Sequence, residues 1–250
     1  TSLAGQTVNE AVVLDFTRHL DGVVAVDSEA QTATVEAGCL LGSLNERLAP
    51  HGLKFAPDPA WGDKSAVGGA VGNNSTGAHS LVYGKTDHYV ESAEVVLADG
   101  SVTRLGEVPV ADLRARADPD GSILDRVAAE VVEILDEDRE AVRERFPALK
   151  RNVSGYNLDR LVAEADGEYG DPGSVNLARL LAGSEGTLAV VTEVTVSLEP
   201  IPETKAVGLL TYDSLANAMA DVAPILDHDP AAVEVMDDVL LELARDTPEF

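Results

Sequence analysis

Cysteine is almost absent from this sequence, because Cys39 is the only one among 250 residues. A single cysteine excludes an internal disulfide, and this chain alone cannot supply an iron–sulfur cluster or a thiolate zinc site. The 5 histidines show no spacing typical of metal ligands, so we expect no metal. Cys39 itself precedes a leucine-rich stretch and is interpreted as a small buried apolar residue in a reducing cytoplasm.

Long hydrophobic runs are also missing. They reach four or five residues, as in residues 11–14, whereas a helix that spans a bilayer needs about 20. No basic segment followed by an apolar one is visible, so we expect neither a signal peptide nor an integral membrane segment. Because the chain begins at Thr1 without a methionine, we expect it to be part of a longer protein, truncated at both ends.

Lysine is scarce, and all basic residues together number 18 against 44 acidic ones, which gives a net charge of -26. A surface of this sign repels phosphate backbones, so nucleic-acid binding is excluded for the bulk surface. The acidic residues are spread along the whole chain, which argues against a disordered acidic tail. Dispersed acid with little lysine resembles proteins of salt-loving archaea. We favour this origin over an acidic protein of a mesophile.

The chain is long enough for one large or two small domains, and its composition is that of a globular protein. Val-rich stretches broken by polar turns predict strands, and leucines on one face predict a helix that ends near Gly52. The predicted strands are residues 11–16, 23–27, 32–37, 94–98, 101–105 and 188–198, and the predicted helices are residues 40–48, 122–145 and 176–182. Residues 164–174 are predicted to form a surface loop.

A domain boundary is predicted at residues 199–202, where two prolines lie close together. The following stretch predicts a β-α-β-α unit, with strands at 206–212 and 232–236 and helices at 213–226 and 237–245. This unit has too few strands to close a sheet. We therefore interpret residues 1–200 as one domain and residues 201–250 as the beginning of a second.

Several familiar motifs fail on inspection. Residues 84–86 would end a phosphate-binding P-loop only if glycine stood at the position of His79. The serine of residues 183–186 lacks the glycine two positions earlier that a nucleophile elbow needs, because that residue is Ala182. No Gly-x-Gly-x-x-Gly follows a predicted strand, which disfavours a Rossmann domain for a nicotinamide cofactor.

A glycine-rich stretch remains, with the sequence SAVGGAVGNNSTGAHSLVYG at residues 65–84. Its glycines permit a close approach of backbone to a ligand, and its Asn, Ser and Thr side chains can bind phosphate or ribose. Backbone N–H groups in such a turn can form an anion-binding nest without Lys or Arg. A tight surface loop, in which Gly and Asn serve only the turns, explains the composition equally well.

Four segments of the sequence, taken in order, resemble one known protein family. The sequence resembles the FAD-binding domain of the p-cresol methylhydroxylase-type (PCMH-type, vanillyl-alcohol oxidase) superfamily. Within this superfamily it is most similar to the group that contains the flavoprotein of glycolate oxidase, D-lactate dehydrogenase and D-2-hydroxyglutarate dehydrogenase. The segments that carry the resemblance are TSLAGQ (1–6), PDPAWGDKSAVGGAVGNNSTGAHSLVYGKT (57–86), EVVLADG (94–100) and LLAGSEGTLAVVTEVTVSLEP (180–200).

The resemblance implies an α+β fold in which two subdomains hold FAD between them, followed by a ferredoxin-like substrate domain that begins at residue 201. It implies cofactor contacts from four places. The first pyrophosphate loop ends with Thr1, Ser2, Leu3, Ala4, Gly5 and Gln6, although the family's preceding glycine run is missing here. The other implied contacts are Pro57, Asp58 and Pro59; Gly68, Gly69, Asn73, Asn74, Ser75, Gly77 and Ser80; and Glu185, Gly186, Val190 and Val191.

Some of these residues also have simpler structural interpretations. A turn or capping role is the less favoured alternative for Glu185, and Val190 and Val191 are core strand residues whether or not adenine packs nearby. Ala189 departs from the family's usual glycine, a small change. His79 does not match the family's usual flavin-linking histidine, so we expect non-covalent FAD, and Tyr83 is interpreted as a packing residue.

The resemblance implies an enzyme that oxidises a small D-2-hydroxy acid such as glycolate, D-lactate or D-2-hydroxyglutarate, with hydride transfer to flavin N5. The family's base and substrate ligands lie mostly in the C-terminal domain, so no catalytic residue is assigned here. An electron acceptor is implied: a quinone, an electron carrier or an iron–sulfur partner. Peripheral attachment to the inner face of the membrane and association into a homo-oligomer are left open.

Two alternatives remain at this point. The same FAD domain could act on another alcohol or on a lactone, or the chain could fold as a cofactor-free structural domain.

The charge balance generates the first prediction, which concerns salt. The Debye length falls from about 10 Å at 0.1 M to about 3 Å at 1 M ionic strength, so added salt screens the repulsion among acidic side chains. We expect the thermal unfolding midpoint to rise steadily between 0.1 M and 2 M KCl. Calorimetry measures this midpoint, and a protein of near-zero net charge serves as the control for general salt effects. An equal rise of the midpoint in both proteins would contradict the prediction.

Overall fold

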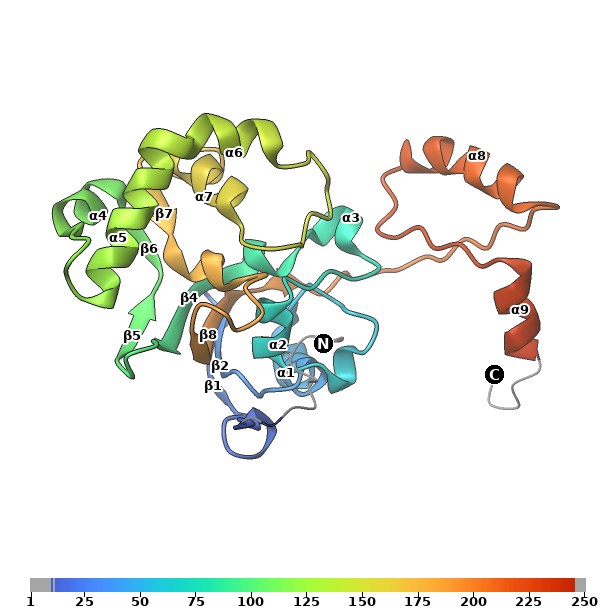
Figure 1. Ribbon diagram of the computed structural model, residues 1–250. Helices are drawn as coiled ribbons and strands as arrows, with labels where there is room; N and C mark the ends of the chain where they lie inside the picture. Colours follow the sequence, from blue (N-terminus) through green and yellow to red (C-terminus); the bar gives the residue numbers. More distant parts are fainter. Residues whose placement is uncertain (1–9, 11, 246–250) are drawn as a thin grey trace.

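The computed structural model describes residues 10 and 12–245 and has the mixed α+β fold that the sequence predicts (Figure 1). At its centre lies a five-stranded antiparallel sheet with the order β1-β2-β8-β4-β5. Its strands are β1 (Val23–Asp27), β2 (Thr32–Glu36), β4 (Val90–Val96), β5 (Val102–Leu105) and β8 (Val190–Ser197). Two short antiparallel pairs join β3 (Leu53–Lys54) to β9 (Glu199–Pro200) and β6 (Glu107–Pro109) to β7 (Ser174–Asn176).

One face of the sheet and two helices form the first core. Alternate residues of the inner strands are buried, such as Val35 on β2 and Val194 on β8, and they pack with α1 (Leu41–Leu48) and α2 (Val67–Gly72). The leucines at 41, 44 and 48 of α1 recur at helical spacing and are at most 2% exposed. Full burial of each such side chain contributes about 1.5–3 kcal/mol, so this stripe fixes α1 on the sheet.

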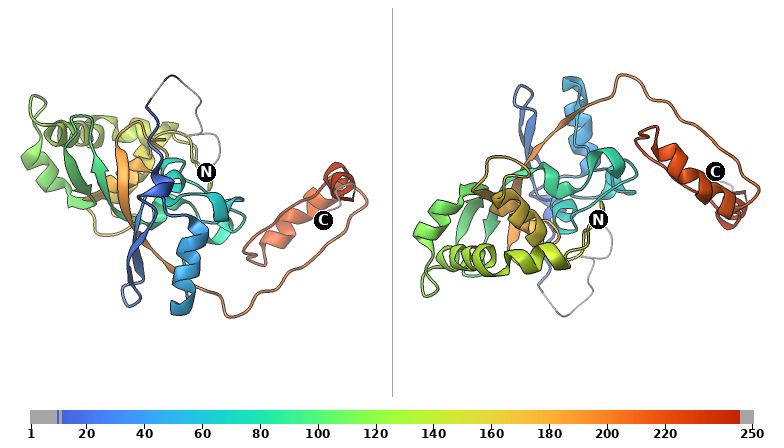
Figure 2. Two further views of the ribbon diagram at one scale, coloured as in Figure 1. Left: turned by 90° about the horizontal axis from the view of Figure 1, so that it is seen from below. Right: turned by 90° about the horizontal axis from the view of Figure 1, so that it is seen from above.

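Four helices and the β6–β7 pair form a second core beside the first (Figures 1 and 2). The helices are α4 (Val110–Arg116), α5 (Ile123–Glu133), α6 (Arg139–Arg145) and α7 (Leu158–Ala165). A capping box between Ser122 and Asp125 begins α5, and a π-helical turn over Ile134–Asp138 joins α5 to α6. The helix predicted over residues 122–145 is therefore present, with one wider turn inside it.

A buried ionic network links the second core to strand β4. The Glu164 carboxylate on α7 accepts hydrogen bonds from Arg160, from Arg179 and from the backbone N–H of Asn176. Arg179 also donates to the Val90 carbonyl, and the Asn176 amide donates to the carbonyls of Val90 and Glu91. Because buried charges are stable only when paired, this network fixes how the α7 layer sits on the central sheet.

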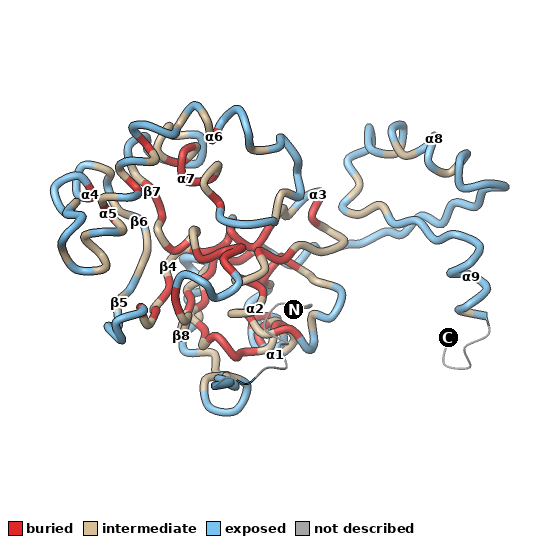
Figure 3. The backbone as a smooth tube through the Cα atoms, in the orientation of Figure 1, coloured by how far each residue is buried: buried red, intermediate tan, exposed pale blue. Residues whose placement is uncertain are grey.

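Residues beyond Pro200 extend away from this body (Figures 1 and 2). The predicted helices are present as α8 (Leu215–Leu226) and α9 (Asp238–Arg245), and neither contains a buried residue. The strands predicted at 206–212 and 232–236 are not formed, so those two predictions were wrong. Their apolar side chains lie in solvent, as for Val207, which is 95% exposed, because no neighbouring strand or helix packs on them (Figure 3).

The strand predicted at 11–16 is also wrong for the described residues 12–16, which run irregularly into a short 3-10 helix at Phe16–Arg18. Asp15 caps this helix by accepting from the Thr17 backbone N–H. The helix predicted at 176–182 is a 3-10 helix over Leu177–Leu181. Among the described residues, no helix has the length and hydropathy needed to cross a bilayer.

The network around Glu164 generates a stability prediction. Glu164→Gln removes the counter-charge from the buried Arg160 and the partly buried Arg179, and we expect it to lower the free energy of unfolding by about 3–5 kcal/mol. Glu140→Gln is the matched control, since its side chain is 81% exposed against 7% for Glu164 and its ion pair with Arg143 faces solvent. The control should cost less than about 1 kcal/mol. Urea unfolding measures the free energy of unfolding of both variants. Equal losses in the two would contradict the stabilising role of the Glu164 network.

Candidate cofactor site

The turn at residues 57–59 and the glycine-rich loop are packed against each other. The Asp58 carboxylate contacts the ring Nδ1 of His79 and accepts from the His79 backbone N–H at 3.4 Å. A Cβ atom on Gly77 would lie 2.0 Å from the Asp58 carbonyl oxygen, so only glycine allows this approach. Asp58, Gly77 and Ser80 therefore belong to one packed unit, which includes the short helix α3 (Ser80–Tyr83).

Helix α2 carries the first glycines of the loop across the end of β2. Gly68 donates its backbone N–H to the Ala37 carbonyl at 2.8 Å, and a Cβ atom at Gly68 would lie 2.8 Å from that of Ala37. This glycine is thus explained by close helix–strand packing. Its predicted cofactor contact stays a prediction.

Asn74 is the most constrained residue of the loop. It is fully buried, and its backbone has a φ of 48°, in the left-handed region that Asn tolerates better than most residues. Its Oδ1 accepts the Asp87 backbone N–H at 2.9 Å, and its Nδ2 donates to Asn157 at 3.3 Å. Ser75 follows, and its carbonyl accepts both the N–H and the hydroxyl of Thr86. Because the Asn74 side chain is engaged inside the protein, it holds the loop, and the cofactor roles of Asn74 and Ser75 remain predictions.

The second predicted segment, residues 183–191, lies directly beside the end of α2. The backbone N–H groups of Gly183 and Glu185 donate to the carbonyls of Val71 and Gly72, at 3.1 and 2.9 Å. Gly183, Glu185 and Gly186 all have positive φ, between 52° and 84°, a backbone that costs a non-glycine residue such as Glu185 of order 1 kcal/mol. The N–H groups of Ser184 and Thr187 also donate to backbone carbonyls, so the protein's own hydrogen bonds hold this turn against the end of α2.

The remaining predicted residues are placed as follows. Val190 and Val191 lie in β8, opposite Val96 and Val95 of β4, and are half-buried. Residues 1–6 lie outside the described residues. The structure therefore brings the stretches 57–59, 68–80 and 183–186 together.

The stretch 147–157 between α6 and α7 also belongs to this region, and the sequence did not reveal it. Arg151 donates from Nε to the Ser80 hydroxyl at 2.6 Å, and Lys85 donates to the Asn152 carbonyl at 3.0 Å. On the other side, the Tyr156 hydroxyl lies 3.0 Å from that of Thr187. The stretch thus touches both predicted cofactor segments. Its polar, irregular sequence KRNVSGYN was the only available signal.

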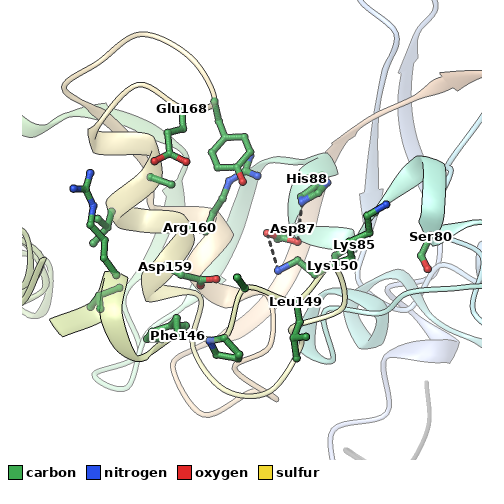
Figure 4. A pocket seen from close by; sticks show the side chains of 18 of the residues that line it. Ser80, Lys85, Asp87, His88, Phe146, Leu149, Lys150, Asp159, Arg160 and Glu168 are labelled. Carbon is green, nitrogen blue, oxygen red and sulfur yellow. Dashed lines mark ion pairs between the residues drawn. The ribbon is translucent and has the colours of Figure 1, made fainter. Parts of the chain in front are cut away.

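A cavity of about 580 Å³ lies between this stretch and the turn after α3 (Figure 4). Ser80 and Lys150 are among its lining residues, and Asp87 is fully buried beside it. Neither Asp87 side-chain oxygen has a hydrogen-bond partner, although Lys85 and His88 form ion pairs with it at 3.7 and 4.0 Å. Burial lowers the pKa of His88, and the nearby Asp87 carboxylate opposes that shift.

The residues present suit a ligand that carries phosphate. The Ser80 hydroxyl accepts from Arg151 and keeps its own hydrogen to donate to such a ligand. No group of three or more His, Cys, Asp or Glu side chains in the described part of the chain is arranged to hold a metal ion.

Two glycines of the loop generate the next prediction. Gly77→Ala would place Cβ 2.0 Å from Asp58 atoms, whereas at Gly72 the nearest atom lies 3.7 Å away and φ is not positive. We expect Gly77→Ala to lower the free energy of unfolding by about 1–3 kcal/mol, and Gly72→Ala to leave it unchanged or raise it by up to about 1 kcal/mol. Chemical denaturation of the two variants measures this, and similar values for both would show that the contact with Asp58 is not tight.

Comparison with known proteins agrees with this geometry. Residues 1–106 match the family model of the FAD binding domain, and residues 201–250 match that of the C-terminal domain of FAD linked oxidases. The chain is 31% identical to a D-2-hydroxyglutarate dehydrogenase of Pantoea ananatis over 98% of this chain and 23% of the relative. It is 30% identical to glycolate oxidase subunit GlcD of Bacillus subtilis over 98% of this chain and 40% of the relative.

The chain spans between about a quarter and two fifths of the length of these relatives. A solved structure of alkyldihydroxyacetonephosphate synthase superposes with a TM-score of 0.55 over 91% of this chain and 31% of that chain, at 18% identity, and so supports the fold. Both family models and both relatives point to FAD-linked oxidases. The sequence thus has the FAD binding domain of these proteins at residues 1–106 and the beginning of their C-terminal domain at residues 201–250.

Proposed function

We propose that this chain is the FAD-binding part of a dehydrogenase that oxidises a small D-2-hydroxy acid to the corresponding 2-oxo acid. The observation that carries the proposal is the convergence of the glycine-rich loop and the 183–186 turn, tied by backbone hydrogen bonds between α2 and residues 183 and 185. Relatives named as D-2-hydroxyglutarate dehydrogenase, glycolate oxidase subunit GlcD and D-lactate dehydrogenase match nearly the whole chain and support the substrate class.

The residues present would hold the cofactor through backbone donors and small polar side chains. The loop from residue 68 to residue 80 would hold the diphosphate and ribityl parts, and residues 185–186 and 190–191 would lie by the adenine half. When bound, FAD would accept the two electrons that the hydroxy acid loses. The chain's own part in the reaction is to orient the cofactor, because the hard chemistry belongs to the flavin.

We further propose a domain boundary near Pro200, where β9 ends the packed body, with residues 201–250 beginning the substrate domain. Two electrons must leave the reduced cofactor, so the proposal includes an acceptor such as a quinone, an electron carrier or an iron–sulfur protein. A cytoplasmic location is proposed from the free thiol of Cys39, which is buried. Burial raises the pKa of this thiol to about 11, so it is unreactive near neutral pH.

The visible absorption spectrum of the full-length protein, purified in high salt, tests this function. We expect flavin bands that pass into the supernatant on acid precipitation, because the cofactor is not covalently bound. We then expect anaerobic bleaching of these bands by one of D-lactate, D-2-hydroxyglutarate or glycolate. The L-enantiomers of lactate and 2-hydroxyglutarate are the matched controls and should leave the bands unchanged.

Two results would contradict the proposal in different ways. If the protein shows no flavin bands even after incubation with FAD, the assignment of FAD as cofactor is contradicted. If the protein contains flavin but none of the hydroxy acids bleaches its bands, the cofactor assignment stands and the substrate class is contradicted.

A further inference from the structure

The charge of the molecule poses a difficulty for the proposed cofactor. FAD carries a diphosphate with two negative charges, and the chain has a net charge of -26. Residues 57–84, which provide most of the proposed site, contain two acids, Asp58 and Asp63, and a single basic residue, Lys64. Like charges in one place cost free energy even when salt screens the rest of the surface. A cation from another part of the chain would therefore strengthen the binding of an anion at this loop.

Most cations near the loop are already engaged. Lys85 is buried, donates to the Asn152 carbonyl and pairs with Asp87. Arg160 and Arg179 are both paired with the buried Glu164 carboxylate. Their charges are neutralised within the protein, so they cannot serve a ligand at the loop.

Arg151 differs from these residues in both position and exposure. Its guanidinium donates from Nε to the Ser80 hydroxyl at 2.6 Å and from Nη2 to the Gly77 carbonyl at 3.0 Å. It has no acidic partner among the described residues and is exposed. A guanidinium has five N–H groups, so these two bonds leave about three of them for a ligand.

The two contacts also hold the guanidinium in a fixed position on the loop. Gly77 and Ser80 lie on either side of His79, which is itself held by Asp58, so the loop presents a rigid platform to Arg151. A planar guanidinium fixed by two bonds loses little further freedom when it binds a phosphate, which it can bind with two parallel hydrogen bonds.

We infer that Arg151 supplies the positive charge that binds the diphosphate of FAD, as part of a third cofactor-binding segment formed by residues 150–157. This inference rests on the proposed function. The segment is held between the two other segments, because Asn157 receives a hydrogen bond from Asn74 and a Cβ atom at Gly183 would lie 2.5 Å from the Gly155 carbonyl. Arg151 thus contacts the glycine-rich loop, and Gly155 of the same segment contacts the 183–186 turn.

The test measures FAD affinity of the full-length apoprotein, by quenching of flavin fluorescence, for a graded series at this residue. We expect Arg151→Lys to raise the Kd a few-fold, Arg151→Gln about tenfold, and Arg151→Glu about a hundredfold, because charge-assisted bonds to phosphate depend on both charge and fork geometry. Arg145→Gln is the matched control: it removes one positive charge from an exposed residue at the end of α6 and should change the Kd less than twofold.

A bracing role for Arg151 gives a different pattern. If Arg151 only held the loop through Ser80 and Gly77, Gln and Glu would weaken FAD binding equally, and both would lower the unfolding midpoint of the apoprotein. That pattern, or a Kd for Arg151→Gln equal to that for Arg145→Gln, would overturn the inference. Failure of the wild-type protein to bind FAD would instead overturn the proposed function, so the two failures are distinguishable.

Discussion

The buried side chain of Asn74 is the constraint on which the candidate site depends. It accepts from the Asp87 backbone on one side and donates to Asn157 on the other, so one amide fixes three segments that are far apart in the sequence. An unpaired amide at this depth would cost about 1–3 kcal/mol, and the residue makes both bonds from a left-handed backbone. The glycine-rich loop is therefore rigid because its own chain holds it. A ligand that enters it meets a surface that is already formed.

The pairing of cations with buried acids also helps to explain how so acidic a chain can fold. Three of its 18 cations pair with buried acids: Arg160 and Arg179 with Glu164, and Lys85 with Asp87. Such pairs contribute specificity because a buried charge tolerates only one arrangement of its neighbours. The rest of the surface is dominated by carboxylates, which disfavour the approach of anions.

Local patterns in the sequence predicted much of the body. Strands 23–27, 32–37 and 188–198 follow from Val-rich alternation, and the structure forms β1, β2 and β8 there. The same pattern failed at 206–212, because a strand exists only when another strand offers its hydrogen bonds, and none lies beside these residues. The sequence did not predict the role of the stretch 147–157 for a related reason. Its importance lies in contacts with residues about 30 to 75 positions away, such as Arg151 with Gly77 and Tyr156 with Thr187, and no local pattern encodes them.

The position of the site between the two cores has a thermodynamic consequence. The glycine-rich loop is tied to the first core through α2, whereas residues 150–157 lead directly into α7 of the second core. Without a ligand, the Glu164 network and the Asn74–Asn157 bond are polar links between these two layers. A ligand that contacts both segments would bind only the assembled arrangement, and so would stabilise it by RT ln(1 + [L]/Kd), about 2.7 kcal/mol at a hundredfold excess over Kd. Under the proposed function, cofactor binding and the docking of the two cores would therefore be coupled.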